Sequence, residues 1–274
     1  MEPSTNFFDV KNKVAVLAGG SGILGSHMAK GLVAAGARAV LLGTNEKNVE
    51  SKAREISTDP TRVLGLKCDV LSKDQLEKTN DVIVKQFGRI DILINAAGGN
   101  IPEATIGIDQ NVFDLHFEDL KKVTDLNFYG TVLPTLIFGK TMATQKKGSV
   151  INMSSMATQR AITRVVGYSA AKAAIDNFTR WMAVEMAKKF GSGIRVNAMA
   201  PGFFITAQNR SLLTNKDGSL TDRGKTILAI TPFGRFGEPD DLIGTVLWLA
   251  SDASAFVTGT IIPIDGGFSA FSGL

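Results

Sequence analysis

The sequence predicts a single α/β domain with a doubly wound, seven-stranded parallel sheet and helices on both faces. Short apolar runs rich in β-branched residues alternate with longer amphipathic segments, which is the order of strands and helices in a parallel sheet. The short runs are apolar throughout, as expected for strands that helices cover on both sides. No linker, repeat or low-complexity segment interrupts this alternation along residues 1–274, so we expect one domain, with a substrate loop at about 203–232.

The expected elements follow in chain order. Strands are predicted at 14–17, 39–42, 63–66, 90–94, 149–152, 194–198 and 260–264, and helices at 25–35, 46–57, 72–87, 118–145, 167–190, 221–229 and 240–251. The segment 98–117 is long for a connection, which favours a functional role. Ligands of parallel sheets bind at the carboxyl ends of the strands, and each motif described below lies at such an end.

Composition limits the function classes. The formal charge of +4 and the pI near 9.1 suit an anionic cofactor or substrate, but scattered Lys and Arg equally fit a solvated surface. No basic run interleaved with aromatic residues indicates nucleic-acid binding. With one cysteine, Cys68, and two histidines, neither an internal disulfide nor a metal site is expected. Residues 1–13 lack an apolar signal core, and no stretch approaches about 20 apolar residues, so we expect a cytoplasmic protein without a membrane partner.

A glycine-rich turn follows the first predicted strand. Residues 18–25 read Ala-Gly-Gly-Ser-Gly-Ile-Leu-Gly and lead into the first predicted helix. Small residues let the backbone approach a pyrophosphate, and a helix N-terminus offers unpaired N–H groups with partial positive charge. Glycines also build plain tight turns, so it is the position after the first strand that favours a dinucleotide.

Two further strand ends bear on the dinucleotide. At the end of the second strand, Gly43, Thr44 and Asn45 include neither the acidic residue typical of NAD sites nor the arginine typical of NADP sites. The missing arginine favours NAD. Glu46 and Lys47 follow directly, and their opposite charges favour NAD and NADP respectively. Asp69, after the third strand, either accepts a hydrogen bond from an adenine amino group or serves as a cap or turn residue.

Tyr168 and Lys172 are four residues apart on a predicted helix and therefore share one face. A phenol with a pKa near about 10 is a weak base at neutral pH, and a nearby ammonium lowers that pKa. Tyr168 can then exchange a proton with a carbonyl or alcohol oxygen. Surface Tyr–Lys pairs with this spacing are common, so the pair alone does not establish a site.

Ser155 and Asn127 add to this pair. Ser155 follows the fifth predicted strand, thirteen positions before Tyr168, and is expected at the same end of the sheet, where its hydroxyl can hold a substrate oxygen. Asn127 lies in the helix after the fourth strand. It either anchors a water that passes protons to Lys172 or caps a kink in that helix.

Together these motifs resemble the short-chain dehydrogenase/reductase family over residues 9–267. The matching pieces are the glycine turn, Asp69, residues 95–98, Asn127, Ser155, Tyr168 with Lys172, Pro201 and Gly202 with Thr206, and residues 265–267. Ala18 and Ile23 stand where the family commonly has threonine and glycine. The resemblance implies a Rossmann-type fold, an NAD or NADP cofactor, and homodimers or homotetramers joined through the helices that contain Asn127 and Tyr168.

The resemblance also implies roles for individual residues. The catalytic tetrad would consist of Asn127, Ser155, Tyr168 and Lys172. The cofactor would contact residues at several strand ends, namely Gly19, Ser21, Gly22, Ile23, Leu24, Thr44, Asp69, Val70, Asn95, Ala96, Ala97, Gly98, Tyr168, Lys172, Pro201, Gly202, Phe204 and Thr206. Asn95 and its neighbours would line the adenosine side, and Phe204 and Thr206 would meet the nicotinamide carboxamide.

Residues 95–100, 203–210 and 266–273 are similar to those of fructuronate reductases (D-mannonate oxidoreductases), a subgroup of this family. Such an enzyme reduces the ketone of the hexuronate fructuronate to the hydroxyl of mannonate. A site for that substrate needs an arginine for the carboxylate and amides for the hydroxyls. We expect these contacts among Asn100, Ser155, Arg164, Tyr168, Gln208, Asn209 and Arg210, although each arginine can equally be a solvated loop residue.

Two other functions stay open from the sequence alone. One is the reduction of another sugar acid, a steroid or an acyl ketone, although the polar run Gln208-Asn209-Arg210 argues against lipid-like substrates. The other is a non-catalytic dinucleotide-sensing or scaffold protein on the same fold, which would need the glycine turn but not Ser155, Tyr168 and Lys172.

Overall fold

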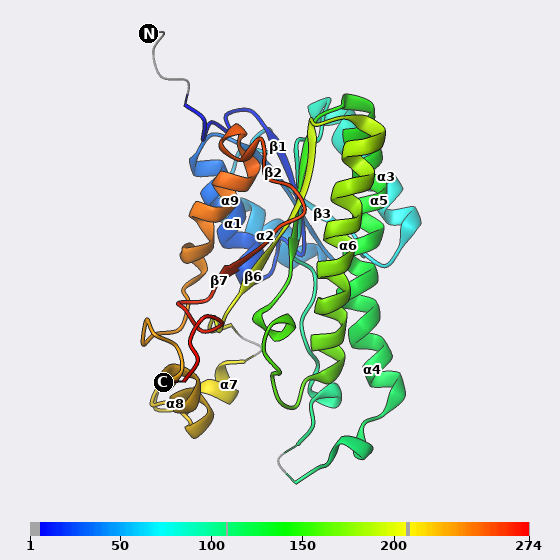
Figure 1. The fold of residues 1–274 in the computed structure, drawn as a ribbon. Coiled ribbons are helices and arrows are strands. Elements are labelled where there is room, and N and C mark those ends of the chain that lie inside the picture. The colour runs from blue at the N-terminus through cyan, green and yellow to red at the C-terminus, as the bar shows by residue number, and fades with distance from the viewer. Residues whose placement is uncertain (1–5, 108, 207–208, 274) are drawn as a thin grey trace.

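The structure, a computed structural model, describes residues 6–107, 109–206 and 209–273. Its centre is a seven-stranded sheet in the order β3-β2-β1-β4-β5-β6-β7, in which all neighbouring strands run parallel (Figure 1). The strands are β1 (Val14–Ala18), β2 (Arg38–Gly43), β3 (Val63–Lys67), β4 (Ile92–Asn95), β5 (Gly148–Met153), β6 (Ile194–Pro201) and β7 (Ile261–Ile264). The chain winds outward from β1 to β3, returns to β4 and continues to β7, which confirms the predicted doubly wound sheet.

Helices cover both faces of the sheet (Figure 1). One layer contains α1 (Ile23–Ala34), α2 (Glu46–Ile56) and α9 (Ile243–Ala250), and the other contains α3 (Lys73–Phe87), α5 (Gly130–Gln145) and α6 (Val166–Phe190). Most helix bounds lie within two residues of those predicted. Across the described ranges, no helix combines the length and apolarity needed to cross a membrane.

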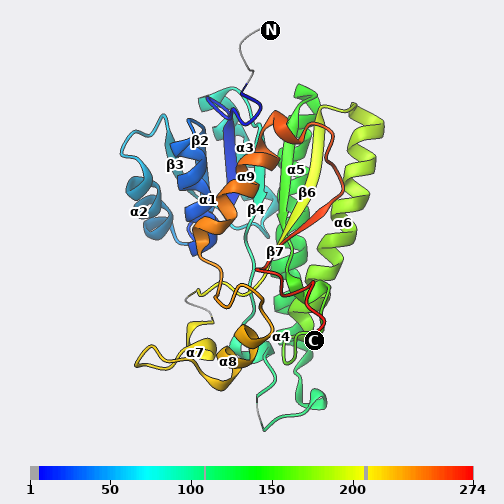
Figure 2. The same ribbon diagram turned by 60° about the vertical axis from the view of Figure 1, so that its left-hand side comes forward.

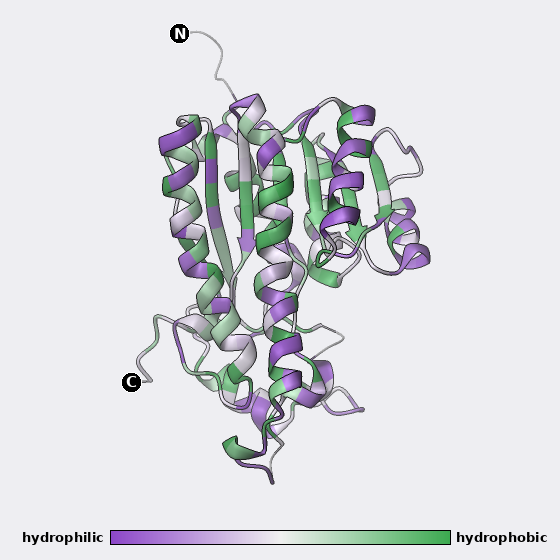
Figure 3. Ribbon diagram, turned by 90° about the vertical axis from the view of Figure 1, so that its right-hand side faces the viewer, coloured by the Kyte–Doolittle hydropathy of each residue, from purple (hydrophilic) through white to green (hydrophobic). Residues whose placement is uncertain are grey.

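The core lies between the sheet and these two helix layers. Because successive strand side chains point to opposite faces, Leu17 of β1 packs in the cluster that contains Met28 of α1, whereas Val16 packs in the cluster that contains Phe138 of α5. All four side chains are fully buried. In Figure 3 the strands are largely hydrophobic and the hydrophilic residues gather on the helices. Burial on both sides therefore explains why the strands are apolar throughout their length.

The segment predicted to be helical at 118–145 is helical throughout, but it is not one regular α-helix. α4 (Phe117–Thr124) and α5 are separated by a π-helical turn at Asp125–Tyr129. A π-turn inserts a residue into the hydrogen-bond ladder without changing the apolar pattern enough to be recognised, and such turns concentrate at functional sites. The helix predicted at 240–251 likewise begins as a 3₁₀ turn (Pro239–Leu242), and the short α7 (Arg210–Leu213) was not predicted.

Two segments extend beyond the carboxyl end of the sheet. One carries α7 and α8 (Asp222–Ala229), which pack against each other. The other is the connection between β4 and α4, which contains two 3₁₀ turns (Pro102–Ala104 and Val112–Asp114) instead of forming an unstructured loop. Figures 1 and 2 show both segments at the same end of the molecule, below the sheet. They therefore build walls around the strand ends.

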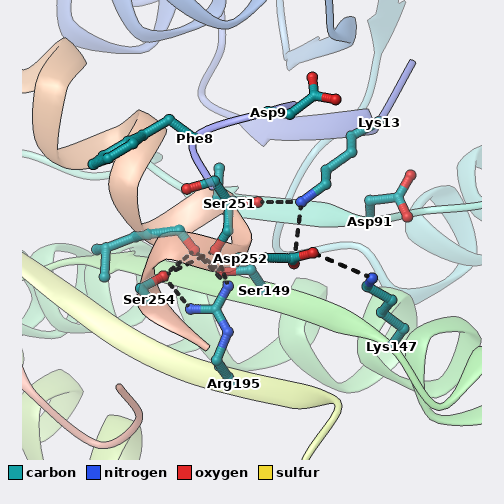
Figure 4. Close-up of polar contacts among 12 residues, drawn as sticks. Phe8, Asp9, Lys13, Asp91, Lys147, Ser149, Arg195, Ser251, Asp252 and Ser254 are labelled. Atoms are coloured by element: carbon teal, nitrogen blue, oxygen red, sulfur yellow. Dashed lines mark hydrogen bonds and ion pairs between the residues drawn. The ribbon is translucent and has the colours of Figure 1, made fainter. Parts of the chain in front are cut away.

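A polar cluster at the opposite end of the strands fixes the end of α9 (Figure 4). Arg195, in β6 and only 8% exposed, donates hydrogen bonds to Ser254 Oγ (2.7 Å) and to the carbonyls of Leu249 (2.8 Å) and Ser251 (3.0 Å). Lys13, just before β1, donates to the carbonyl of the last α9 residue (3.0 Å). Burial lowers the pKa of both Lys13 and Arg195. Because these cations satisfy carbonyls that the helix leaves unpaired, their role is structural.

Arg195→Met tests this structural role. Removing the guanidinium takes a charged donor from two buried main-chain carbonyls and a hydroxyl, and we expect the free energy of unfolding to fall by about 2–4 kcal/mol. Arg54→Met is the matched control, because it breaks only an exposed pair with Glu50 and should cost about 0.3–0.5 kcal/mol. Urea unfolding of both variants measures the difference. Equal losses in the two variants would show that the Arg195 cluster does not stabilise the fold.

Candidate active site

A cavity of about 640 Å³ opens at the carboxyl end of the sheet. This volume lies in the range of small-molecule sites. Its walls come from the ends of β4, β5 and β6, from α6, and from the two segments beyond the sheet. The lining residues used below are Leu24, Ala96, Gly98, Gly99, Asn100, Thr105, Met153, Ser154, Ser155, Arg164, Tyr168, Lys172, Pro201, Gly202, Phe204, Thr206, Asn209 and Arg223.

Tyr168 and Lys172 share one face of α6 and both line this cavity. The Lys172 Nζ atom lies 5.5 Å from the centroid of the Tyr168 ring and donates a hydrogen bond to the Met153 carbonyl (2.7 Å). Lys172 is only 5% exposed, and this burial lowers its pKa to about 8, although the nearby Asp176 carboxylate opposes the shift. The ammonium is therefore held directly behind the phenol.

Asp176 is a residue that the sequence analysis missed. It lies one helical turn after Lys172, is 7% exposed, and its Oδ1 atom accepts a hydrogen bond from the Ser154 hydroxyl. Its negative charge raises the pKa of Lys172 against the effect of burial. The signal was present in the sequence, because Tyr168, Lys172 and Asp176 repeat at intervals of four residues on one helix.

Ser155 faces the Tyr168 phenol from the end of β5. Burial raises the pKa of Tyr168, and a hydrogen bond with the Ser155 side chain partly offsets this shift. The Ser155 Oγ atom also accepts a hydrogen bond from the Ala157 backbone N–H (3.2 Å), where Ser155 caps the 3₁₀ turn Met156–Thr158. A fixed hydroxyl, a protonated phenol and an ammonium thus converge on one wall, where they can hold and protonate a single oxygen atom.

Asn127 lies inside the π-helical turn and is fully buried. Its Oδ1 atom accepts from the Gly99 N–H (3.0 Å), and its Nδ2 atom donates to the carbonyls of Gly99 (2.7 Å) and Val123 (2.8 Å). A Cβ at Gly98 would lie 2.6 Å from Asn127 Oδ1 and 3.5 Å from Lys172 Nζ. The Asn127 side chain therefore fastens the Gly98–Gly99 wall beside Lys172, and a water relay through Asn127 stays a prediction.

The glycine turn fits a bound dinucleotide. Gly19 has a left-handed φ of +78°, and a Cβ there would lie 2.6 Å from the Ala97 nitrogen, so no larger residue fits between the turn and the end of β4. Gly22 is the N-cap of α1, and Ile23 is the first helical residue, with a side chain 39% exposed. Because Ile23 points outward, its replacement of the usual glycine leaves the turn intact. The backbone at the α1 N-terminus can therefore approach a pyrophosphate.

Polar side chains that follow β2 and β3 form a helix cap and a turn. Asn45 caps α2, and its side chain accepts from the Asn48 N–H (3.0 Å). Asp69 Oδ1 accepts from the Leu71 N–H (2.9 Å), which is the turn-forming role weighed from the sequence. Its contact with adenine stays a prediction. Neither strand tip carries an arginine, so the residues present fit a ribose without a 2′-phosphate.

The buried Asn95 side chain lies between the sheet and the helix layer that contains α5 and α6. Its Nδ2 atom donates to Thr135 Oγ1 and Asn152 Oδ1 (both 2.8 Å), and Asn152 in turn donates to Thr179 Oγ1 (2.9 Å). This chain of buried amides and hydroxyls joins β4 and β5 to α5 and α6. The Asn95 side chain thus has a structural use, and any contact with adenosine would come from its backbone or its neighbours.

The segment after β6 forms the wall opposite Tyr168. The Asn209 side chain accepts from the Thr206 N–H (2.8 Å) and donates to the Phe204 carbonyl (2.7 Å), which links it to both residues. A Cβ at Gly202 would lie 2.8 Å from Asp265 Cα, so glycine is required where the chain leaves β6 beside the end of β7. The Asn209 contacts hold Phe204 and Thr206 at the cavity, which both residues line.

The cavity divides the predicted contacts into two groups. Among predicted cofactor residues, Leu24, Ala96, Gly98, Tyr168, Lys172, Pro201, Gly202, Phe204 and Thr206 line it, whereas Gly19, Ser21, Gly22, Ile23, Thr44, Asp69, Val70, Asn95 and Ala97 lie outside it. Among predicted substrate residues, Asn100, Ser155, Arg164, Tyr168 and Asn209 line it. Arg210 is exposed and does not, and Gln208 lies outside the described residues. Arg223 of α8 lines the cavity and was not predicted.

The chain is similar to several known proteins over nearly its whole length. A family model described as Enoyl-(Acyl carrier protein) reductase matches residues 18–269. An uncharacterized oxidoreductase of Bacillus subtilis (strain 168), UxuB, is 42% identical, with 97% of this chain and 98% of that protein aligned. The 2-dehydro-3-deoxy-D-gluconate 5-dehydrogenase of Formosa agariphila is 34% identical, with 98% and 97% aligned. A solved structure of a candidate D-mannonate oxidoreductase from Haemophilus influenza with bound NAD is similar, with a TM-score of 0.89, 41% identity and coverage of 97% and 98%.

The raised pKa of Tyr168 is directly measurable, because the chain has only two tyrosines. In Tyr129→Phe, the ultraviolet absorbance of tyrosinate reports Tyr168 alone, and Tyr168→Phe gives the remaining signal of Tyr129. Because burial raises the pKa of Tyr168, we expect it to ionise in the cofactor-free protein only at a pH above the ordinary tyrosine pKa of about 10. A Tyr168 phenolate already present at about pH 8 would contradict the burial and the Ser155 contact described above.

Proposed function

The chain belongs to the short-chain dehydrogenase/reductase family, and from this premise we propose that it interconverts a ketone and a secondary alcohol on a sugar acid with an NAD or NADP cofactor. The observation that carries the proposal is the convergence of Ser155, Tyr168 and Lys172 on one wall of the cavity. A non-catalytic binding protein has no use for an ammonium buried behind a phenol, since burying that charge costs free energy.

The proposed roles follow from the contacts. When bound, a reduced nicotinamide would supply the hydride that the carbonyl carbon needs. The Ser155 hydroxyl donates a hydrogen bond to the carbonyl oxygen and holds it in place, while Tyr168 gives its phenolic proton to that same oxygen. The Lys172 ammonium stabilises the phenolate that remains, and Lys172 is itself held by the Met153 carbonyl and by the charge of Asp176. The oxidation of an alcohol reverses these proton movements.

We propose fructuronate and mannonate as the ketone and alcohol. Support comes from similarity to the B. subtilis oxidoreductase and to the H. influenza candidate D-mannonate oxidoreductase, both above 40% identity over nearly the whole chain. The cavity suits a substrate with several hydroxyls, because Asn100, Thr105 and Asn209 all line it. The 2-dehydro-3-deoxy-D-gluconate 5-dehydrogenase relative favours a second candidate, a 3-deoxy-2-keto sugar acid whose C5 alcohol is the reacting group.

We propose NAD as the preferred dinucleotide. The end of β2 presents Thr44 and the helix-capping Asn45, and no arginine stands there to pair with a 2′-phosphate. The H. influenza relative has NAD bound. We also propose a cytoplasmic homodimer or homotetramer, and the apolar side chains of Leu136, Trp181 and Val184, each more than half exposed on α5 and α6, support a subunit contact there.

The substrate proposal is tested by the oxidation of reduced nicotinamide in the presence of fructuronate. Turnover is expected with NADH at a higher kcat/KM than with NADPH. Tyr168→Phe removes the proton donor and should lower kcat about a hundred- to ten-thousand-fold, whereas Tyr129→Phe removes the other phenol and should not. Reduction of NAD⁺ with 2-dehydro-3-deoxygluconate, whose C5 alcohol would be oxidised, without turnover of fructuronate would select the second candidate. Unchanged kcat in Tyr168→Phe would reject the proposed mechanism.

A pH profile tests the role of Lys172. Its pKa is lowered to about 8, so the ammonium is present below that pH and lost as the pH rises through it. With saturating reduced cofactor, kcat/KM for the ketone should therefore fall above about pH 8. Lys172→Arg keeps a cation, since a guanidinium stays protonated throughout the assay range, and should move this fall to higher pH. If the fall stays at the same pH in a folded Lys172→Arg variant, another group controls it.

A further inference from the structure

We propose that Arg164 and Arg223 together form a carboxylate-binding subsite in the cavity, which selects acids over neutral sugars. Arg223 lies on α8, far from Arg164 in the sequence, and both side chains line the cavity that holds Ser155 and Tyr168. The inference rests on the proposed function and names the residues that would read the acid group of the substrate.

Arg164 is held in place by two contacts with one partner. The Ile106 N–H donates to the Arg164 carbonyl (3.0 Å), and Arg164 Nε donates to the Ile106 carbonyl. Arg164 has a left-handed φ of +76°, a conformation that costs free energy for a side chain of this size. Among the described residues, its two terminal amino groups form no hydrogen bond. The guanidinium is therefore anchored at Nε and keeps its paired donors for a ligand.

Arg223 reaches the same place from the other side. Its Nη1 atom lies 3.4 Å from Thr163 Oγ1, next to Arg164 in the chain, and the residue is half-buried. The pKa of Arg223 is lowered first by burial and then by the positive charge of Arg164. α8 thus brings a second guanidinium close enough for the two charges to interact.

No carboxylate of the chain balances these charges within the described ranges. Neither arginine takes part in an ion pair there, and Asp222, which directly precedes Arg223, pairs instead with Lys225. The charged residues that line the cavity are Arg164, Lys172 and Arg223, all of them cations. Two neighbouring guanidinium groups repel each other, and a carboxylate that binds both would remove the repulsion while it accepts paired hydrogen bonds.

The rest of the cavity fits a hydroxylated chain attached to that carboxylate. Asn100 lines the cavity and donates from Nδ2 to Thr105 Oγ1, while its buried Oδ1 atom has no hydrogen-bond partner in the part of the chain that the structure describes. A substrate hydroxyl can satisfy this acceptor. The ligand class is therefore a polyhydroxy acid, whose carboxylate binds the arginine pair while its ketone or alcohol lies at Ser155 and Tyr168.

A binding measurement tests the subsite without turnover. Thermal unfolding is followed with D-mannonate, with its neutral counterpart mannitol, and with inorganic phosphate at the same concentration. The wild type should be stabilised by mannonate well beyond mannitol, and Arg164→Met and Arg223→Met should each lose most of that shift. Lys225→Met, which removes an exposed cation from the same helix, is the control and should keep it. Stabilisation by phosphate but not by mannonate, or a mannonate shift that survives in the double arginine variant, overturns the proposal.

Kinetics separate this proposal from the proposed substrate. With fructuronate, each arginine variant should raise KM about ten- to a hundred-fold, since hydrogen bonds to a charged group are lost. With fructose, which has a hydroxymethyl group in place of the carboxylate, the wild type and both variants should have the same low kcat/KM. If mannonate binding depends on both arginines but fructuronate is not turned over, the substrate proposal fails while the subsite stands. If fructuronate is turned over with unchanged KM in both variants, the subsite fails alone.

Discussion

The buried ammonium of Lys172 is the interaction on which the rest of the site depends. Its pKa of about 8, against an ordinary value of 10.5, means that the folded protein holds this proton less tightly than the unfolded chain does. Below about pH 8 this difference costs the fold roughly 3 kcal/mol, and the cost disappears as the pH rises toward the unfolded value. The Met153 carbonyl and Asp176 hold the charge despite this cost. Strongly shifted pKa values of this kind are typical of functional sites.

The surrounding strands, turns and helices hold the Lys172 ammonium in place. The end of β5 provides the Met153 carbonyl, Ser154, which holds Asp176, and Ser155, which meets the phenol. The π-turn places Asn127 so that it fastens the Gly98–Gly99 wall against Lys172. Further inside, the buried amide network that includes Asn95 keeps β4 and β5 in register with α6. A sheet of parallel strands brings all of these residues to one edge.

Much of this arrangement was predictable from the sequence, because its signals are local. Continuous apolar runs predicted the seven strands, and the spacing of Tyr168 and Lys172 predicted a shared helix face. Signals that depend on tertiary contacts were not predictable. The π-turn leaves the apolar pattern unchanged, and Arg223 meets Arg164 only because α8 folds back over the cavity. Asn95 belongs to a sequence motif that resembles the cofactor-binding residues of the family. Only the structure shows that its side chain instead forms buried hydrogen bonds with Thr135 and Asn152.

The positive charge of the cavity lowers the stability of the fold and favours the binding of anionic ligands. Three cations line one cavity, where burial disfavours the charged forms of Lys172 and Arg223 and the charge of Arg164 adds to this effect at Arg223. Anionic ligands remove part of that cost when they bind, so the repulsion in the empty protein adds to the affinity for acids. The same repulsion disfavours a neutral polyol, which takes up the space without neutralising any charge. A cavity built in this way distinguishes ligands by their charge before it distinguishes them by the stereochemistry of their hydroxyls.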